Sequence, residues 1–143
     1  MIAYFDTSAF VPLLIREPTT AFCQRLWNEA DSVVSSRLLY VETAAALAQG
    51  LRLERLTERQ HTDALRLHTR MWQEFDVVEA DETVTERAAT LAHDLALRGY
   101  DAVHVASAER LDDHDLVVAS GDRKLLDACI KLGLTTADTN SQP

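Results

Sequence analysis

Short apolar runs alternate with helix-like segments along the whole chain. The first run, residues 2–5, is uninterrupted by polar side chains, which is typical of a strand buried on both faces. Further strands are expected at 32–35, 75–79, 116–119 and 134–137. Parallel strands need long crossover connections, and helix-like segments stand between these runs. The pattern therefore predicts a single α/β domain built on a central parallel sheet.

Apolar residues that recur every three or four positions predict the helices. Thr57 and Gln60 have the spacing of a capping box, which opens a helix running to about Glu74. Together with the preceding helix over 37–53, it predicts a two-helix insertion between the second and third strands. Gly99 is expected to end the helix that precedes it, because glycine is favoured just past helix ends.

The composition is that of an ordinary globular chain. Its 143 residues suit one domain with one core, and the apolar fraction of 47% argues against disorder. The net charge of -9 does not point to a nucleic-acid partner, because phosphate affinity usually comes from basic patches. A nucleic-acid substrate would need positive charge from another source, such as a bound divalent cation.

The cysteines and the lack of targeting segments indicate a cytoplasmic protein. Cys23 and Cys129 lie far apart in helix-like segments, as expected for two reduced and mostly buried thiols. A disulfide between them is the alternative that the sequence leaves open. We find no signal peptide, and no window approaches the roughly 20 apolar residues of a membrane span.

Carboxylates and hydroxyls follow two of the predicted strands. Asp6 and Ser8 come after the first strand, and Ser120 and Asp122 come after the fourth. The carboxyl ends of parallel strands share one edge, where ligands bind in open α/β sheets, so we expect the two groups to be adjacent. The alternative is that both aspartates only cap the helices that follow, a role that aspartate fills readily.

Two further acids are expected near the same edge. Asp101 falls at the start of a helix, where capping is again the alternative. Glu42 is harder to explain, because all its helical neighbours three and four residues away are apolar: Leu38, Leu39, Ala45 and Ala46. A carboxylate there is costly unless it is paired, protonated or bound to a metal, or lies at the edge of the stripe and reaches solvent.

Four carboxylates at one edge require a compensating charge. Two of them about 4 Å apart repel by roughly 4 kcal/mol at an effective dielectric of 20. An oxygen-only set of ligands suits Mg²⁺ or Mn²⁺. Such an ion can orient a water molecule and stabilise the leaving oxygen of a phosphodiester. Ser8 and Ser120 are candidates to support the carboxylates.

The remaining polar residues give weaker signals. The histidines have no zinc-site spacing; His104 is near enough to Asp101 to orient it, although a core or surface role is the simpler interpretation. An arginine-rich region follows Glu42, but interleaved acids favour a solvated, salt-bridged face over a surface for RNA phosphates. Its arginines are Arg52, Arg55, Arg59, Arg66 and Arg70.

Four motifs in this order make the sequence similar to the PIN-domain ribonucleases of the VapC toxin type, found in bacterial toxin–antitoxin pairs. They are YFDTS at 4–8, YVETA at 40–44, GYDAVHVA at 99–106 and ASGD at 119–122. The resemblance implies a PIN-like three-layer α/β/α sandwich around a parallel sheet. We expect this domain to span 1–138, with a flexible C-terminal tail over 139–143.

The resemblance also implies roles for the site residues. Asp6, Glu42, Asp101 and Asp122 would be an acidic quartet that binds one or two Mg²⁺ ions, with Mn²⁺ as a substitute. Ser8 and Ser120 match the hydroxyls that support such a quartet. Many relatives have threonine at the position of Ser120, and the hydroxyl is retained here.

The implied function is that of a metal-dependent RNA endonuclease. Similar proteins cleave structured RNA, often transfer or ribosomal RNA, and leave a 3′-hydroxyl. They are usually homodimers. A small antitoxin wraps the toxin, can place a basic side chain in the acidic pocket, and carries the complex to its operator DNA. We expect no membrane partner.

Other functions remain as alternatives. The protein could be a catalytically silent acidic binding module, such as a decoy that titrates an antitoxin, although no acid of the quartet is missing. A receiver-type phosphoacceptor domain is disfavoured because Thr7 and Ser8 follow Asp6 where such domains need an acidic pair. A haloacid-dehalogenase-type phosphatase would need an acid at the position of Ser8.

Overall fold

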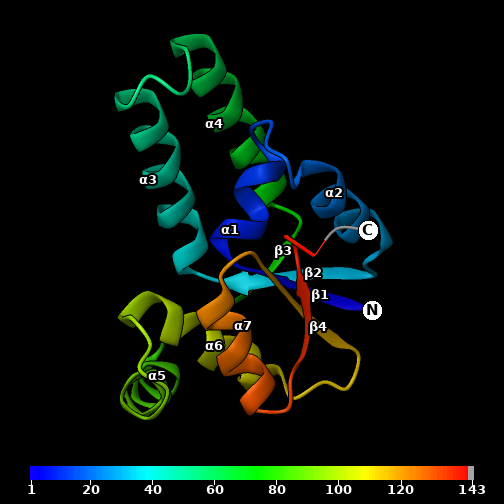
Figure 1. Ribbon diagram of the computed structural model, residues 1–143, viewed down its shortest axis with the longest axis vertical. Coiled ribbons are helices and arrows are strands. Elements are labelled where there is room, and N and C mark those ends of the chain that lie inside the picture. The colour runs from blue at the N-terminus through cyan, green and yellow to red at the C-terminus, as the bar shows by residue number, and fades with distance from the viewer. Residues whose placement is uncertain (142–143) are drawn as a thin grey trace.

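The computed structural model describes residues 1–141, which form an α/β domain on a parallel sheet (Figure 1). Within this range all neighbouring strands are parallel, in the order β3-β2-β1-β4-β5. The strands are β1 (Ile2–Phe5), β2 (Ser32–Ser36), β3 (Phe75–Val78), β4 (Leu116–Ser120) and β5 (Thr135–Asp138). The predicted fold class and the five predicted strands are confirmed.

Helices connect the strands and cover the sheet. They are α1 (Thr7–Phe10), the 3-10 helix η1 (Val11–Leu13), α2 (Thr20–Glu29), α3 (Leu38–Arg52), α4 (Glu58–Trp72), α5 (Glu82–Asp94), α6 (Gly99–Leu111) and α7 (Arg123–Lys131). Helices α3 and α4 form the predicted insertion, which projects away from the sheet (Figure 1). The capping box is confirmed, because Thr57 and Gln60 each accept the other's backbone N–H with their side chains.

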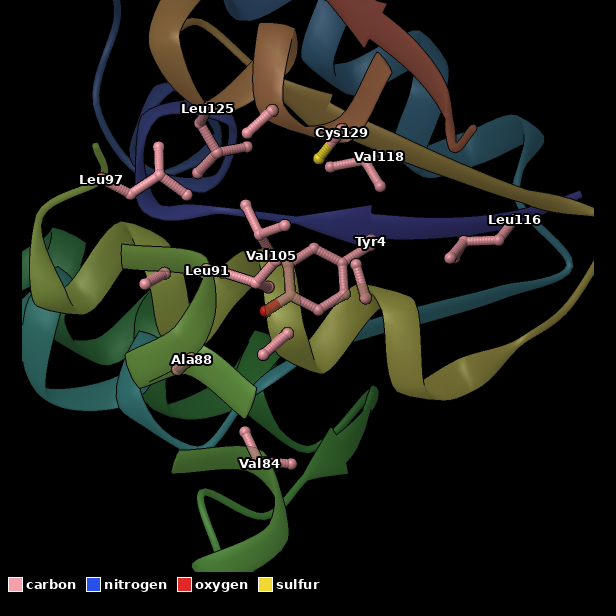
Figure 2. Packing of buried hydrophobic residues seen from close by; sticks show 14 of the residues in the cluster. Tyr4, Val84, Ala88, Leu91, Leu97, Val105, Leu116, Val118, Leu125 and Cys129 are labelled. Atoms are coloured by element: carbon pink, nitrogen blue, oxygen red, sulfur yellow. The ribbon is translucent and has the colours of Figure 1, made fainter. Parts of the chain in front are cut away.

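The sheet separates two apolar cores, which makes the fold a three-layer sandwich. Successive side chains of β1 point to opposite faces, as the pleat of a strand requires. Tyr4 packs in the core shared with α5, α6 and α7, where Figure 2 shows it beside Val105. Ala3 and Phe5 pack in the opposite core, with residues from α1, α3 and α4. Every residue of β1 after Ile2 is thus buried, and this strand holds its carboxyl end rigidly.

The prediction that Gly99 ends the helix before it is wrong. Helix α5 ends at Asp94, and Gly99 is the first residue of α6. The chain leaves α5 through Ala96, whose φ of 54° lies in the left-handed region. The N–H of Leu97 then donates to the carbonyl of Ala92 at 3.2 Å. An alanine has therefore taken the conformation for which glycine is usually favoured.

The cysteines are free and buried, which agrees with the prediction of two reduced thiols. Burial raises the pKa of the Cys23 thiol to about 11 and that of Cys129 to about 12. Both thiols therefore stay protonated near neutral pH. Across residues 1–141, no helix is long and apolar enough to cross a bilayer.

The C-terminal segment continues past the end of β5. Thr139 is buried, and its N–H donates to the carbonyl of Ser120 at 3.0 Å. The side-chain amide of Asn140 donates to the carbonyl of Gly121, also at 3.0 Å. Residues 142–143 of the predicted tail lie outside the described residues. The first residues after β5 are therefore attached to the loop that follows β4.

We expect the stability of the insertion to depend on Leu47, one of the buried leucines of α3. Leu47 on α3 is fully buried, so Leu47→Ala should lower the free energy of unfolding by about 2–5 kcal/mol, measured by urea denaturation. Leu53, at the end of the same helix, is 52% exposed, and Leu53→Ala should change stability much less. Equal effects of the two substitutions would show that Leu47 adds nothing to the core that it shares with residues of α1 and α4.

Candidate active site

A pocket of ≈ 390 Å³ lies at the C-terminal edge of the sheet. The structure places all four predicted acids in its lining: Asp6, Glu42, Asp101 and Asp122. Ser8 also lines the pocket, and Ser120 is buried next to Asp6. The acids come from four different parts of the chain, and the parallel sheet brings them together.

Asp6 is the most enclosed of these acids, with only 5% of its surface exposed. Its Oδ1 accepts hydrogen bonds from Ser8 Oγ at 2.7 Å and from the N–H of Ala9 at 3.0 Å. Its Oδ2 accepts one from Ser120 Oγ at 2.6 Å. Burial raises the pKa of this carboxyl, although these hydrogen bonds act in the opposite direction. A nearby cation would stabilise the ionised form of Asp6.

The two serines join the ends of β1 and β4. Ser8 Oγ accepts a hydrogen bond from the N–H of Gly121 at 2.7 Å, and Ser120 Oγ accepts one from the N–H of Asp122 at 3.0 Å. A Cβ atom at Gly121 would lie 2.9 Å from Thr139 Oγ1 and 3.6 Å from Ser8 Oγ. A side chain at position 121 would therefore force Thr139 to shift, and the C-terminal segment supports the loop that carries Asp122.

The capping alternative holds for two of the three aspartates. Asp6 caps α1 through its bond to Ala9, and Asp122 caps α7 with Oδ1, which accepts from the N–H of Lys124 at 2.9 Å. Asp101 lies in the first turn of α6 and is not the N-cap of that helix. Capping occupies one oxygen of Asp6 and one of Asp122. It does not explain why both carboxylates line the same pocket.

Arg98, which the sequence analysis did not single out, binds two of the acids. Its Nε lies 3.0 Å from Asp101 Oδ2, and its Nη2 lies 3.7 Å from Asp122 Oδ2. Among the described residues that line the pocket, Arg98 is the only arginine or lysine. Its position directly before the GYDAVHVA motif was the available signal, but the sequence shows no contact between Arg98 and Asp122.

Glu42 is paired with a buried histidine. Its Oε1 lies 2.5 Å from His104 Nε2, and His104 Nδ1 lies 2.8 Å from the hydroxyl of Tyr4. The side chain of Glu42 is 20% exposed and that of His104 only 2%. Glu42 therefore does not simply reach solvent from the edge of an apolar stripe. The hydrogen bond of His104 goes to Glu42 and not to Asp101, the partner suggested by the sequence.

Tyr4 completes this chain of hydrogen bonds from the centre of the sheet. Burial raises the pKa of its hydroxyl, so the hydroxyl stays protonated and able to donate. In the neutral imidazole, Nδ1 of His104 accepts from Tyr4 and Nε2 donates to Glu42. Sequence reasoning missed Tyr4 because an aromatic residue in a buried strand looks like ordinary core.

The donor set fits a hard cation, although the carboxylates are not packed as a ready-made cage. Within residues 1–141, no group of three or more His, Cys, Asp or Glu side chains is placed to hold a metal ion together. Mg²⁺ is usually bound by only one or two carboxylates, and waters and substrate phosphates complete its coordination. The pocket is lined by the four predicted acids and by a fifth, Glu17, which the sequence analysis did not single out. Asp6 among them is buried and has a raised pKa, so this lining suits such a cation.

Comparison with known proteins gives a family match over most of the chain. The sequence profile of the PIN domain matches residues 3–131. Ribonuclease VapC45 and Ribonuclease VapC49 of Mycobacterium tuberculosis are each 42% identical to this chain over 142 residues, which cover 99% of this chain and 99% of each relative.

Solved structures share the fold at lower identity. PAE2754 from Pyrobaculum aerophilum has a TM-score of 0.69 and 24% identity, over 90% of this chain and 87% of its own. Mycobacterium tuberculosis VapC20, described as a sarcin-ricin loop cleaving toxin, has a TM-score of 0.67 and 20% identity, over 88% and 94%. The family profile, the near full-length relatives and the shared fold agree. The chain belongs to the PIN-domain family and, within it, to the VapC ribonucleases.

Proposed function

We propose that this protein is a divalent-metal-dependent endoribonuclease and the toxin of a bacterial toxin–antitoxin pair, acting in the cytoplasm. The observation that carries the proposal is the meeting of Asp6, Glu42, Asp101 and Asp122 in one pocket at the sheet edge. The similarity to two proteins named ribonucleases, over nearly the full chain, supports the RNA substrate.

In this proposal the four carboxylates hold one or two Mg²⁺ ions, with Mn²⁺ as a substitute. The ion, when bound, supplies positive charge for the phosphodiester and the leaving oxygen. Asp6 is held in place by the hydroxyls of Ser8 and Ser120, which fix both of its oxygens. His104 holds Oε1 of Glu42, so the orientation of that carboxylate is set by a buried residue.

The proposed substrate is structured RNA, such as transfer or ribosomal RNA, cleaved to leave a 3′-hydroxyl. The proposed partners are a second copy of the chain and a small antitoxin that places a basic side chain in the acidic pocket. Support comes from neighbours of the same fold, which include a toxin–antitoxin complex from Klebsiella pneumoniae and a DNA-bound VapBC from Salmonella typhimurium. By this analogy, operator DNA is reached only through the antitoxin.

The first test is loss of RNA cleavage. Asp6→Asn and Asp101→Asn should each lower the cleavage rate by about 100-fold or more, because even residues that only support metal ligands cost 10- to 100-fold. The rate is measured on labelled RNA with Mg²⁺, and a chelator should stop the wild-type reaction. Asp63→Asn, an exposed change on α4, is the matched control. Unchanged cleavage by the two site variants would reject this site.

The second test concerns stability and pH. The pKa of Asp6 is higher in the folded protein than in the unfolded chain, where it is about 3.9. Ionisation of Asp6 therefore lowers the stability of the fold, and this loss grows as pH rises above about 3.9. In chelator, Asp6→Asn should therefore raise Tm at pH 7.5, and the gain should shrink as pH falls towards 4. Mg²⁺ should raise the Tm of the wild type more than that of the variant. If the rise in Tm caused by Asp6→Asn were independent of pH, burial would not be raising the pKa of Asp6.

The third test concerns His104. His104→Ala should lower the cleavage rate by about 10- to 100-fold and raise the Mg²⁺ concentration needed for half-maximal rate, because Glu42 loses its orienting partner. His104→Gln keeps an N–H donor and should recover part of the loss. If the wild type, His104→Ala and His104→Gln all showed the same Mg²⁺ dependence of the cleavage rate, His104 would not position Glu42.

A further inference from the structure

We infer that Arg98 is a cation-dependent RNA ligand: a divalent ion displaces its guanidinium from Asp101 and Asp122, and the released side chain binds a phosphate of the RNA strand. The inference rests on the proposed function, because it requires a divalent ion at these carboxylates. It adds a residue that contacts the substrate and a reason for RNA binding to depend on the cation.

The geometry makes Arg98 and the ion competitors. Arg98 contacts Oδ2 of Asp101 at 3.0 Å and Oδ2 of Asp122 at 3.7 Å, so it draws on the negative charge of two of the four acids. A Mg²⁺ ion bound to either oxygen would lie about 2.1 Å from it. The ion would then repel the guanidinium from the same place. Binding of the ion and the present position of Arg98 therefore oppose each other.

The exposure of Arg98 makes this exchange easy. Its side chain is 80% exposed, whereas Asp101 and Asp122 are 16% and 29% exposed. Ion pairs of exposed side chains contribute little to stability, so a divalent ion has only a weak contact to break. The backbone of Arg98 is fixed as the N-cap of α6. A released guanidinium therefore stays at the rim of the pocket.

The charge of the surroundings indicates what the released guanidinium would bind. The chain has a net charge of -9, and Arg98 is the only arginine or lysine among the described residues that line the pocket. Arg123, which directly follows Asp122, does not line the pocket and pairs with Asp127 at 3.0 Å and Asp138 at 3.1 Å. An RNA phosphate entering this acidic site would therefore meet the released guanidinium of Arg98, the one arginine or lysine in the lining within residues 1–141. The planar fork of arginine matches phosphate oxygens well.

The first measurement is cation affinity, by calorimetric titration of Mg²⁺ and Mn²⁺. Arg98→Ala removes the competitor and should bind the ion roughly 2- to 10-fold more tightly than the wild type. Arg98→Lys retains a charge and should fall between them. Arg87→Ala is the matched control, because Arg87 pairs with Glu109 outside the pocket. Equal cation affinity in wild type and Arg98→Ala would overturn the competition.

The second measurement is RNA affinity, with transfer RNA as the probe and Ca²⁺ in place of Mg²⁺ to slow cleavage. Wild type should bind more tightly with Ca²⁺ than with chelator. In Arg98→Ala with Ca²⁺, the negative slope of log K against log salt should become less steep by about 0.7 to 0.9, which is the contribution of one phosphate contact. The slope should not change in chelator, where Arg98 remains on its carboxylates. A slope that is unaffected by Arg98→Ala under both conditions would overturn the phosphate role.

The two proposals fail in different ways. A wild-type protein that binds no divalent ion and cleaves no RNA would overturn the proposed function and this inference together. A wild type that binds the ion and cleaves RNA, beside an Arg98→Ala variant with unchanged ion affinity and salt slope, would overturn only the role of Arg98.

Discussion

The pairing of β1 with β4 is the contact on which the site depends. Its parallel register sets Phe5 opposite Ala119, and the N–H of Asp6 then donates to the carbonyl of Ala119 at 3.3 Å. Ser120 thereby comes close enough to hold Asp6 Oδ2 at 2.6 Å. Because both strands lie inside the sheet, the same pairing also removes Asp6 from water. The pairing of β1 with β4 therefore both places Asp6 at the site and buries its carboxyl group, which raises its pKa.

The four acids of the predicted quartet are held by partners of several kinds, and Asp101 and Asp122 share Arg98. Asp6 is held by hydroxyls, and Asp122 uses one oxygen to cap α7. Glu42 meets an imidazole, and Asp101 meets a guanidinium. Each partner offsets part of the repulsion that like charges at one edge would otherwise cause. These partners also fix the orientation of the carboxylates, so the acids stay ordered although they repel one another.

Much of this structure could be predicted from local patterns. The uninterrupted apolar run of β1 and the capping box of Thr57 are local signals, and both describe the structure correctly. Gly99 shows where such signals fail. Glycine is the common residue at a helix end, but the chain used Ala96 for the left-handed position and placed Gly99 inside the next helix. Helices α5 and α6 share one core, and such tertiary packing is not recorded by local propensity.

The sequence by itself determined the parallel α/β fold and the four acids at its edge, because strand burial, helix periodicity and the position of a residue after a strand are all local properties. Only the tertiary structure decided the partners of those acids. His104 is 62 residues from Glu42 and 100 from Tyr4 along the chain. Arg98 reaches Asp122 only because α6 and α7 begin beside the same pocket. Contacts over such distances depend on how helices pack on the sheet, and no sequence spacing encodes them.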